Sequence, residues 1–279
     1  MGEYFRGWYY RCQSDRQTLA VIASLHHTGN SKFCAIQLIT DSQSFHIQLP
    51  YWDYQRLDQD ICIAGCRFGK ERLCLGIHSS GLHASGAVGF GPLTPIRYDI
   101  MGPFRYVPFL QCRHRIFSMR HTVNGTLSVN GTPYVFQNAL GYMEGDRGYS
   151  FPRKYLWTQC SFPQGALMLS IADIPFGGIP FTGVIGIVLL NGKEYRLATY
   201  LGARAVKLSA DEIAVRQGRF VLTVRPQGPL GHPLRAPVSG AMIRTIHEHP
   251  SCRVFYRLEE KGIPLLELDA PNAAMEYEY

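Results

Sequence analysis

The stretch GYMEGDRGYSFPRKYLWTQC, residues 141–160, gathers charged groups between apolar segments. Its carboxyl groups, Glu144 and Asp146, follow a segment from residue 100 to 143 that contains no acidic residue. Burial in an apolar pocket raises the pKa of a carboxyl group, which then keeps a proton available for general acid catalysis. We therefore predict Glu144 and Asp146 as candidate catalytic residues. Arg147 is predicted to bind a ligand, or alternatively to neutralise one of these groups in a salt bridge.

A second set of candidates alternates along the segment that follows. Tyr155, Trp157 and Gln159 are spaced by two, so in a β-strand they share one face. If that face points into a pocket, two aromatic rings and an amide line it, and all three residues are predicted to bind a ligand. The alternative is that they are ordinary core residues. Trp8 and Tyr10 are the counterparts of these aromatic residues in the first half of the chain. Trp8 is predicted to bind a ligand; alternatively, both rings fill the interior of the first barrel.

Geometry restricts the cysteine and histidine chemistry of the segment CRHRIF. Cys112 and His114 share a face of the expected strand, about 7 Å apart, which is too far for direct activation of a thiol nucleophile. His114 is therefore predicted as a hydrogen-bond donor to a ligand. The other histidine pairs lack a convincing third ligand, so the sequence predicts no metal site.

The composition favours an all-β chain. Of 279 residues, 46% are apolar and 18% are charged, so the chain is long enough for two domains with substantial cores. The 17 prolines and 28 glycines divide it into short segments. That pattern is typical of strands and turns rather than of helices.

The net charge of +7 is compatible with several kinds of partner. A basic surface attracts nucleic acids, acidic membranes or anionic substrates. No zinc-finger, RRM or KH signature is present, so no nucleic-acid partner is expected, while peripheral membrane contact and the oligomeric state stay open. The N-terminal MGEYFRGWYYRC lacks the apolar core of a signal peptide, and eight cysteines without an export signal predict free thiols in the cytoplasm.

The chain repeats itself internally. The segments that resemble each other, in the same order, are 7–12 and 154–160, 18–25 and 166–173, 31–40 and 181–190, 60–77 and 211–224, 84–90 and 238–244, and 140–146 and 273–279. This repeat predicts two tandem lipocalin-like antiparallel barrels or sandwiches with little helix, covering residues 1–146 and 147–279. A turn at Gly145–Gly148 would join them.

Local signals place several turns and one buried strand. Asn-Gly pairs at 124–125, 130–131 and 191–192 are typical of type I′ hairpin turns. The apolar run from Ile174 to Leu190 is interrupted by proline and glycine. It predicts a bend followed by a strand buried on both faces, rather than a membrane helix.

Four stretches share the pattern of one known family. They are the charged stretch itself, MGPFRYVPFLQCRHRIFSMRHTVNGTLSV upstream of it (101–129), the opening EYFRGWYYRC, and LRAPVSGAMIRTIHE (234–248). Together they resemble bacterial members of the tocopherol cyclase-like family, over essentially the whole chain. Relatives of that family with similar paired barrels include carotenoid hydratases and natural-product cyclases. This chain carries GDRGYSFP where we expect a more acidic or aromatic centre, so the substrate stays open.

The resemblance implies a cyclase or isomerase that uses no cofactor and no metal. The plant enzyme closes a prenylated quinol into a chromanol, so a small, apolar, quinol-like substrate is expected. This closure needs a general acid, an acceptor for the phenol proton and aromatic faces for a tertiary cation. Two alternatives stay open: a lipocalin-like carrier that binds an apolar ligand without turnover, and a protein whose pocket is filled by its own side chains.

Overall fold

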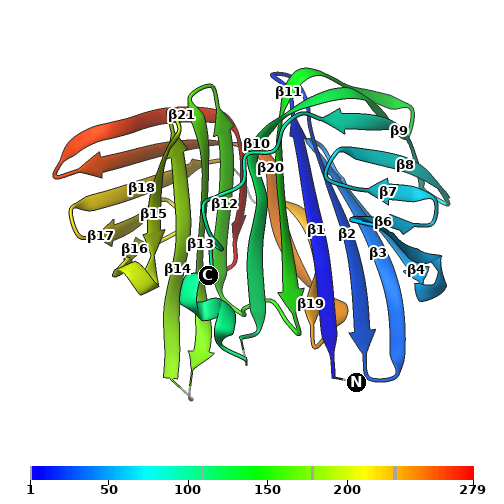
Figure 1. Cartoon of the computed structure of the whole chain (residues 1–279), viewed down its shortest axis with the longest axis horizontal. Helices are drawn as coiled ribbons and strands as arrows, with labels where there is room; N and C mark the ends of the chain where they lie inside the picture. The colour runs from blue at the N-terminus through cyan, green and yellow to red at the C-terminus, as the bar shows by residue number, and fades with distance from the viewer. Residues whose placement is uncertain (1, 109, 177–178, 229–230) are drawn as a thin grey trace.

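The computed structural model of the chain describes residues 2–108, 110–176, 179–228 and 231–279. Within these residues, two large antiparallel sheets lie beside each other and curl in opposite directions (Figure 1). The helices described are three short 3-10 turns: η1 (Tyr51–Asp53), η2 (Gly102–Tyr106) and η3 (Thr199–Leu201). None of the described helices is long and apolar enough to cross a membrane. The predicted all-β, lipocalin-like fold with little helix is confirmed.

The first sheet contains eleven strands in the order β4-β3-β2-β1-β11-β10-β9-β8-β7-β6-β5. Their bounds are β1 (Tyr4–Gln13), β2 (Thr18–Thr28), β3 (Ser31–Thr40), β4 (Ser44–Pro50), β5 (Tyr54–Leu57), β6 (Asp60–Ile63), β7 (Cys66–Phe68), β8 (Arg72–Ser79), β9 (Leu82–Phe90), β10 (Cys112–Val129) and β11 (Thr132–Gly148). The long strands β10 and β11 return the chain to the side of β1, so the strand that begins the sheet and the strand that ends it are hydrogen-bonded neighbours.

The second sheet follows the order β15-β14-β13-β12-β21-β20-β18-β17-β16, with β19 paired to β20. Its strands are β12 (Tyr155–Phe162), β13 (Gly165–Phe176), β14 (Ile179–Leu190), β15 (Lys193–Ala198), β16 (Arg204–Leu208), β17 (Ile213–Gln217), β18 (Phe220–Gln227), β19 (His232–Val238), β20 (Ala241–Glu260) and β21 (Ile263–Tyr277). From β15 to β16 this order corresponds strand by strand to the first sheet's order from β4 to β7, whereas β6 and β5 have no counterpart on the path.

This correspondence tests the individual sequence matches. β1, β2 and β3 occupy the same places as β12, β13 and β14, as the first three matched pairs predict, and β11 occupies the place of β21. Two other matches are wrong. The segment 84–90 lies in β9, which takes the place of β18, whereas 238–244 covers the end of β19, a turn and the start of β20. The segment 211–224 covers β17 and the start of β18, which take the places of β8 and β9, whereas 60–77 covers β6, β7 and most of β8. β19 is an added strand that shifted the apparent alignment.

Three apolar cores hold the molecule together. One fills the first curled sheet and includes Tyr10 and Cys12 of β1; another fills the second sheet and includes Leu156 and Cys160 of β12. The third lies between the sheets and is built from the opposite faces of the same strands. Because the central strands are buried on both faces, their sequences read as continuous apolar runs rather than as alternating patterns.

The turn predictions are partly right. Asn130-Gly131 and Asn191-Gly192 connect hairpins, and all four residues have positive φ, as a type I′ turn requires. The prediction for 124–125 is wrong, since Gly125 lies inside β10 at a register shift. A Cβ atom there would lie 2.3 Å from the carbonyl oxygen of Ala87 on β9, so the glycine permits close strand approach, not reversal of the chain.

The charged stretch does not turn at Gly145–Gly148. β11 continues through Gly148, and residues 149–154 carry the chain to the first strand of the second sheet. Gly148 is needed there, because a Cβ atom would lie 1.9 Å from the Gln111 carbonyl oxygen. The bend predicted in the run from Ile174 to Leu190 falls between β13 and β14, which pair with each other as far as Phe176 and Ile179. Residues 177–178 lie outside the described part of the chain.

Candidate active site

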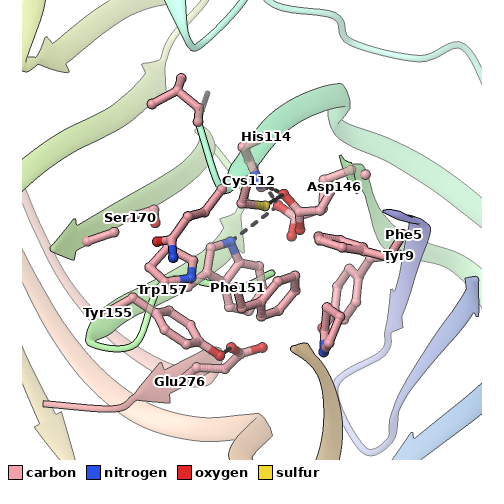
Figure 2. A pocket seen from close by; sticks show the side chains of 18 of the residues that line it. Phe5, Tyr9, Cys112, His114, Asp146, Phe151, Tyr155, Trp157, Ser170 and Glu276 are labelled. Atoms are coloured by element: carbon pink, nitrogen blue, oxygen red, sulfur yellow. Dashed lines mark hydrogen bonds and ion pairs between the residues drawn. The ribbon is translucent and has the colours of Figure 1, made fainter. Parts of the chain in front are cut away.

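A cavity of about 180 Å³ lies between the two sheets. Its volume is roughly ten times what one ordered water molecule needs. Aromatic side chains form much of its wall, and three carboxyl groups reach it: Phe5, Tyr9, Phe104, Phe151, Tyr155 and Trp157, with Glu144, Asp146 and Glu276. Figure 2 shows the labelled side chains converging from both sheets, with His114, Cys112 and Asp146 grouped together and Tyr155 beside Glu276.

Strand pairing brings the polar residues together. In the first sheet, His114 of β10 lies opposite Asp146 of β11, and Ile116 lies opposite Glu144. Because side chains alternate along a strand, Glu144 and Asp146 share the face that points toward the second sheet. Trp157 of β12 approaches from the other side of the cavity. Segments more than thirty residues apart in the chain therefore meet at one point.

His114 bridges the two predicted catalytic carboxylates. Its Nε2 atom lies 3.0 Å from Glu144 Oε2, and its Nδ1 atom lies 3.0 Å from Asp146 Oδ1. The His114 side chain is only 10% exposed. Burial alone lowers its pKa, but the negative charges of Glu144 and Asp146 outweigh that effect and hold the pKa well above the ordinary value. His114 is therefore an imidazolium at neutral pH.

Glu144 acts as an acceptor for several donors at once. It accepts hydrogen bonds from the Tyr142 hydroxyl and, at 3.2 Å, from the Trp157 indole nitrogen, in addition to its ion pair with His114. Burial raises the pKa of the Tyr142 hydroxyl well above its usual value, and the nearby Glu144 charge adds to that shift. Glu144 thus positions His114 and Trp157.

Glu276 of β21 is in a different environment. It accepts a hydrogen bond from the Tyr155 hydroxyl. Burial, reinforced by the negative charges of Glu248 and Glu144, raises the pKa of Glu276 well above the ordinary value, although the Tyr155 hydrogen bond opposes the shift. This carboxyl group of the cavity wall therefore holds its proton more tightly than an ordinary glutamate does.

Glu248 lies beside Glu276, since the two residues are register partners on β20 and β21. Its Oε1 atom accepts a 2.7 Å hydrogen bond from the Tyr9 hydroxyl, and its Oε2 atom is buried without a hydrogen-bond partner among the described residues. Burial raises the pKa of Glu248 to about 7, against the lowering effects of the Tyr9 hydrogen bond and the Arg11 charge. A second carboxyl group of this sheet thus holds its proton more tightly than usual.

Two of the predicted ligand-binding residues lie outside the cavity. Gln159 is completely buried and bonds to Arg11 and Ser161, so it joins the two sheets instead of facing a ligand. Arg147 follows Asp146 directly, so its side chain points to the opposite face of β11, where it lines a separate surface pocket. It forms no ion pair with either carboxylate among the described residues; His114 takes that role.

The other predicted residues reach the cavity. Tyr155, Trp157, His114, Glu144 and Asp146 all line it. Trp8 contributes to the lining as well, while its ring packs against the first sheet's core.

The chemistry of the polar cluster bears on metal binding and on nucleophilic catalysis. His114, Glu144 and Asp146 each offer a ligand atom within 4.8 Å of the others. A protonated imidazole cannot ligate a metal, so an ion would have to displace one of the two ring protons of His114, which face Glu144 and Asp146. Burial and the Asp146 charge raise the pKa of the Cys112 thiol well above its usual value, so it does not supply a thiolate. All eight cysteines are free.

Several residues of the site were not predicted from the sequence. Glu276, Tyr9, Tyr142 and Gln111 all contact the cavity or its carboxylates. The internal repeat carried one usable signal, because it aligned Glu276 with Glu144. Gln111 lines the cavity, and its side-chain Oε1 atom is buried without a hydrogen-bond partner among the described residues.

Comparison with known proteins shows which family this chain resembles. The tocopherol cyclase-like family model matches residues 82–179. A probable chloroplastic tocopherol cyclase of Oryza sativa subsp. japonica is 31% identical over 78 residues, which are 28% of this chain and 17% of the rice protein. The resemblance to the tocopherol cyclase-like family is thereby confirmed, although the match spans less than a fifth of the rice protein's length.

Solved structures share the overall fold. Kievitone hydratase from Nectria haematococca has a TM-score of 0.57 at 9% identity, covering 99% of this chain and 89% of that chain. CghA has a TM-score of 0.64 at 10% identity, covering 99% and 88%. A putative AttH from Nitrosomonas europaea has a TM-score of 0.56 at 12% identity, covering 100% and 93%. At these identities the likeness shows the fold alone.

Proposed function

We propose that this protein is a cofactor-free cyclase whose apolar substrate carries both an alkene and a hydroxyl group, such as a prenylated quinol. The family resemblance supports a function of the cyclase or hydratase type. The observation that carries the proposal is the pairing of two unlike carboxyl groups in one apolar cavity. Glu276 favours its protonated form, whereas Asp146 is ion-paired to a protonated His114. Two titratable groups in opposed states suit an acid and a base.

Glu276 is the proposed general acid. Its O–H proton is transferred to the alkene carbon, which leaves a tertiary cation on the substrate and a carboxylate on Glu276. The Tyr155 hydroxyl, already bonded to Glu276, stabilises that new charge. This assigns to Glu276 the acid role that the sequence led us to expect for Glu144 or Asp146.

Asp146 is the proposed acceptor of the hydroxyl proton. As the substrate oxygen bonds to the cationic carbon, its O–H bond breaks and the proton passes to Asp146. His114 fixes the carboxylate for this step, and Glu144 fixes His114. The side chain of Asp146 is 22% exposed, so its proton can return to Glu276 by way of solvent and complete the cycle without net consumption of protons.

Aromatic rings surround the space between the acid and the base. Tyr9 and Trp157 meet edge to face, with ring centroids 5.5 Å apart, and Phe151 packs against Tyr155. The faces of such rings attract a cation. Gln111 also lines this space.

Product analysis after incubation with prenylated hydroquinones tests the proposal. We expect chromanol formation by the wild-type protein and a loss of about 10² to 10⁴ in turnover for Glu276→Gln, the range for a general acid. Asp146→Asn should also lose turnover, and both variants should retain ligand binding in a thermal-shift assay. Glu71→Gln, at an exposed glutamate, is the control.

Three results would contradict the proposal. Full turnover by Glu276→Gln would remove the assigned acid. Ligand binding by the wild-type protein without any product would favour the carrier function. Absence of both binding and turnover would favour a cavity occupied only by the protein's own side chains.

A further inference from the structure

A second pocket, of about 420 Å³, opens on the surface of the first sheet. Three arginines from three different segments line it: Arg105 of η2, Arg113 of β10 and Arg147 of β11. Its remaining wall consists of Glu3, Tyr4, Pro108, Leu110, Gly148 and Tyr149. Three cations and one carboxylate therefore face a single recess.

The arginines are arranged in register across neighbouring strands. Arg147 lies directly opposite Arg113 in the β10–β11 pair and directly opposite Arg6 in the β1–β11 pair. Like charges in cross-strand register destabilise a sheet. A row of this kind gains stability when an anion lies against it.

The protein itself supplies little compensation for these charges. Arg113 donates a 2.5 Å hydrogen bond from Nη2 to the carbonyl oxygen of Val107, and the Arg105 guanidinium lies 5.2 Å from the Tyr106 ring centroid. Across the four described ranges, no ion pair joins a carboxylate to Arg105, Arg113 or Arg147. Apart from the bond of Arg113 to Val107, their N–H donors are available to a ligand.

The basic pocket adjoins the apolar cavity. Leu110 lines both, and it is 5% exposed. Successive side chains of β11 reach different sites: Asp146 faces the cavity, and the next residue, Arg147, faces the basic pocket. The two sites lie on opposite faces of β11 and meet at Leu110, just before β10 begins and near the end of β11, so a molecule that passes these strand ends would place an apolar part in the cavity and a charged end against the arginines.

We propose that this pocket binds the anionic end of an amphiphilic ligand, a carboxylate or a phosphate, while the apolar part of the same molecule occupies the cavity. The planar guanidinium group matches both anions through paired hydrogen bonds. This inference rests on the proposed function for the apolar part of the ligand. It narrows the substrate class from apolar molecules to amphiphiles with an acidic group.

Calorimetric titration with matched probes tests the inference. Dodecyl phosphate, dodecanoate and dodecanol share one chain and differ in the head group; inorganic phosphate supplies the head group alone. We expect the two anionic probes to bind at least about tenfold more tightly than dodecanol, given the strength of charge-assisted hydrogen bonds. They should also bind more tightly than inorganic phosphate, and their affinity should fall as salt is added.

Arg147→Gln is the primary variant, because Arg147 is exposed and its change should leave the fold intact. It should weaken dodecyl phosphate binding about tenfold and leave dodecanol binding unchanged. Arg113→Gln should act in the same direction, although it also loses the bond to Val107. Arg16→Gln is the matched control, since Arg16 is exposed in the loop between β1 and β2.

Several results would overturn the inference. Equal affinity for dodecanol and dodecyl phosphate would show that the head group is not recognised. Equal affinity for inorganic phosphate would separate the pocket from the cavity, and binding only to vesicles containing anionic lipid would assign the arginines to a membrane surface. Failure of prenylated quinols to react would contradict the proposed function alone, because these head-group comparisons do not depend on turnover.

Discussion

The ends of β10 and β11 and the ends of β20 and β21 occupy corresponding places in the two sheets, yet they carry opposite chemistry. Glu144 corresponds to Glu276, and both face the same cavity. At the place of His114, two residues before the partner of that glutamate, the second sheet has Ile246. The first site is an ion-paired cluster around an imidazolium; the second is a carboxyl group bonded to a tyrosine.

The contrast between the His114 cluster and Glu276 indicates how two related sheets can provide both an acid and a base. Two carboxyl groups that face one apolar cavity compete for charge, and the group without a cation favours protonation. Burial and the charge of Glu248 raise the pKa of Glu276, and the charges of Glu144 and Asp146 raise it further. His114 pairs with both of these carboxylates.

The largest effect should come from making the first site resemble the second. His114→Ile removes the cation between Glu144 and Asp146 and leaves a buried carboxylate without its partner. We expect the free energy of unfolding to fall by about 3 to 5 kcal/mol, together with loss of turnover. Chemical denaturation measures the first effect, and product analysis the second.

A second substitution isolates the cause of that effect. In the His114→Ile background, Glu144→Gln removes the buried charge and should restore a large part of the lost stability without restoring turnover. If the double variant is as unstable as the single one, packing of the imidazole ring, not charge compensation, is what His114 provides.

The next effect concerns pH and the second sheet. The pKa of Glu248 is raised to about 7, so the folded state binds its proton more tightly than the unfolded state does. The resulting stability is fully present below the ordinary glutamate pKa and is lost as pH rises toward 7. The loss is on the order of 3 kcal/mol, since one pKa unit corresponds to about 1.4 kcal/mol.

Glu248→Gln provides the comparison for this effect. Melting temperatures measured from pH 4.5 to 7.5 should show the wild-type protein losing stability relative to the variant as pH rises. Parallel curves for the two proteins would mean that Glu248 is not the group that titrates.

A smaller effect should separate two matched tyrosines. Tyr142 donates to Glu144, and Tyr9 donates to Glu248. Tyr142→Phe removes a hydrogen bond to a charged acceptor, at about 1.5 to 3 kcal/mol, while Tyr9→Phe removes one to a carboxyl group that takes up a proton near neutrality, at about 0.5 to 1.5 kcal/mol. Denaturant titration at pH 6 measures both. Equal losses would argue against different charge states in the two sheets.

The smallest effect is expected at Cys112. Its thiol lies 3.5 Å from Asp146 Oδ1, and its raised pKa keeps it neutral. Cys112→Ser preserves a donor of similar size, so turnover should change less than about twofold. The low fraction of thiolate at neutral pH is the reason. Complete loss of activity, or covalent trapping of substrate on Cys112, would instead make the cysteine a nucleophile.

Sequence patterns determined the fold class and part of the site. Apolar segments divided by glycine and proline predict strands, and the repeat predicts two related sheets, because local propensity and periodicity are properties of neighbouring residues. The alternation of Tyr155 and Trp157 placed both on one face, and both line the cavity. The Asn-Gly pair at 124–125 wrongly predicted a turn. Gly125 is required there because the backbone of β9, more than thirty residues away in the chain, leaves no room for a Cβ atom.

Tertiary structure alone decided which carboxyl groups act and in which state. The residues next to Glu276 in the sequence do not indicate a raised pKa. The pKa of Glu276 is raised by burial and by the charges of Glu248 and Glu144, which lie on other strands. Arg147 and Asp146 are adjacent in the chain and looked like one charged site, yet the pleat sends them to opposite faces of β11. The state of a charge depends on its distance from other charges and from water, and the fold sets both.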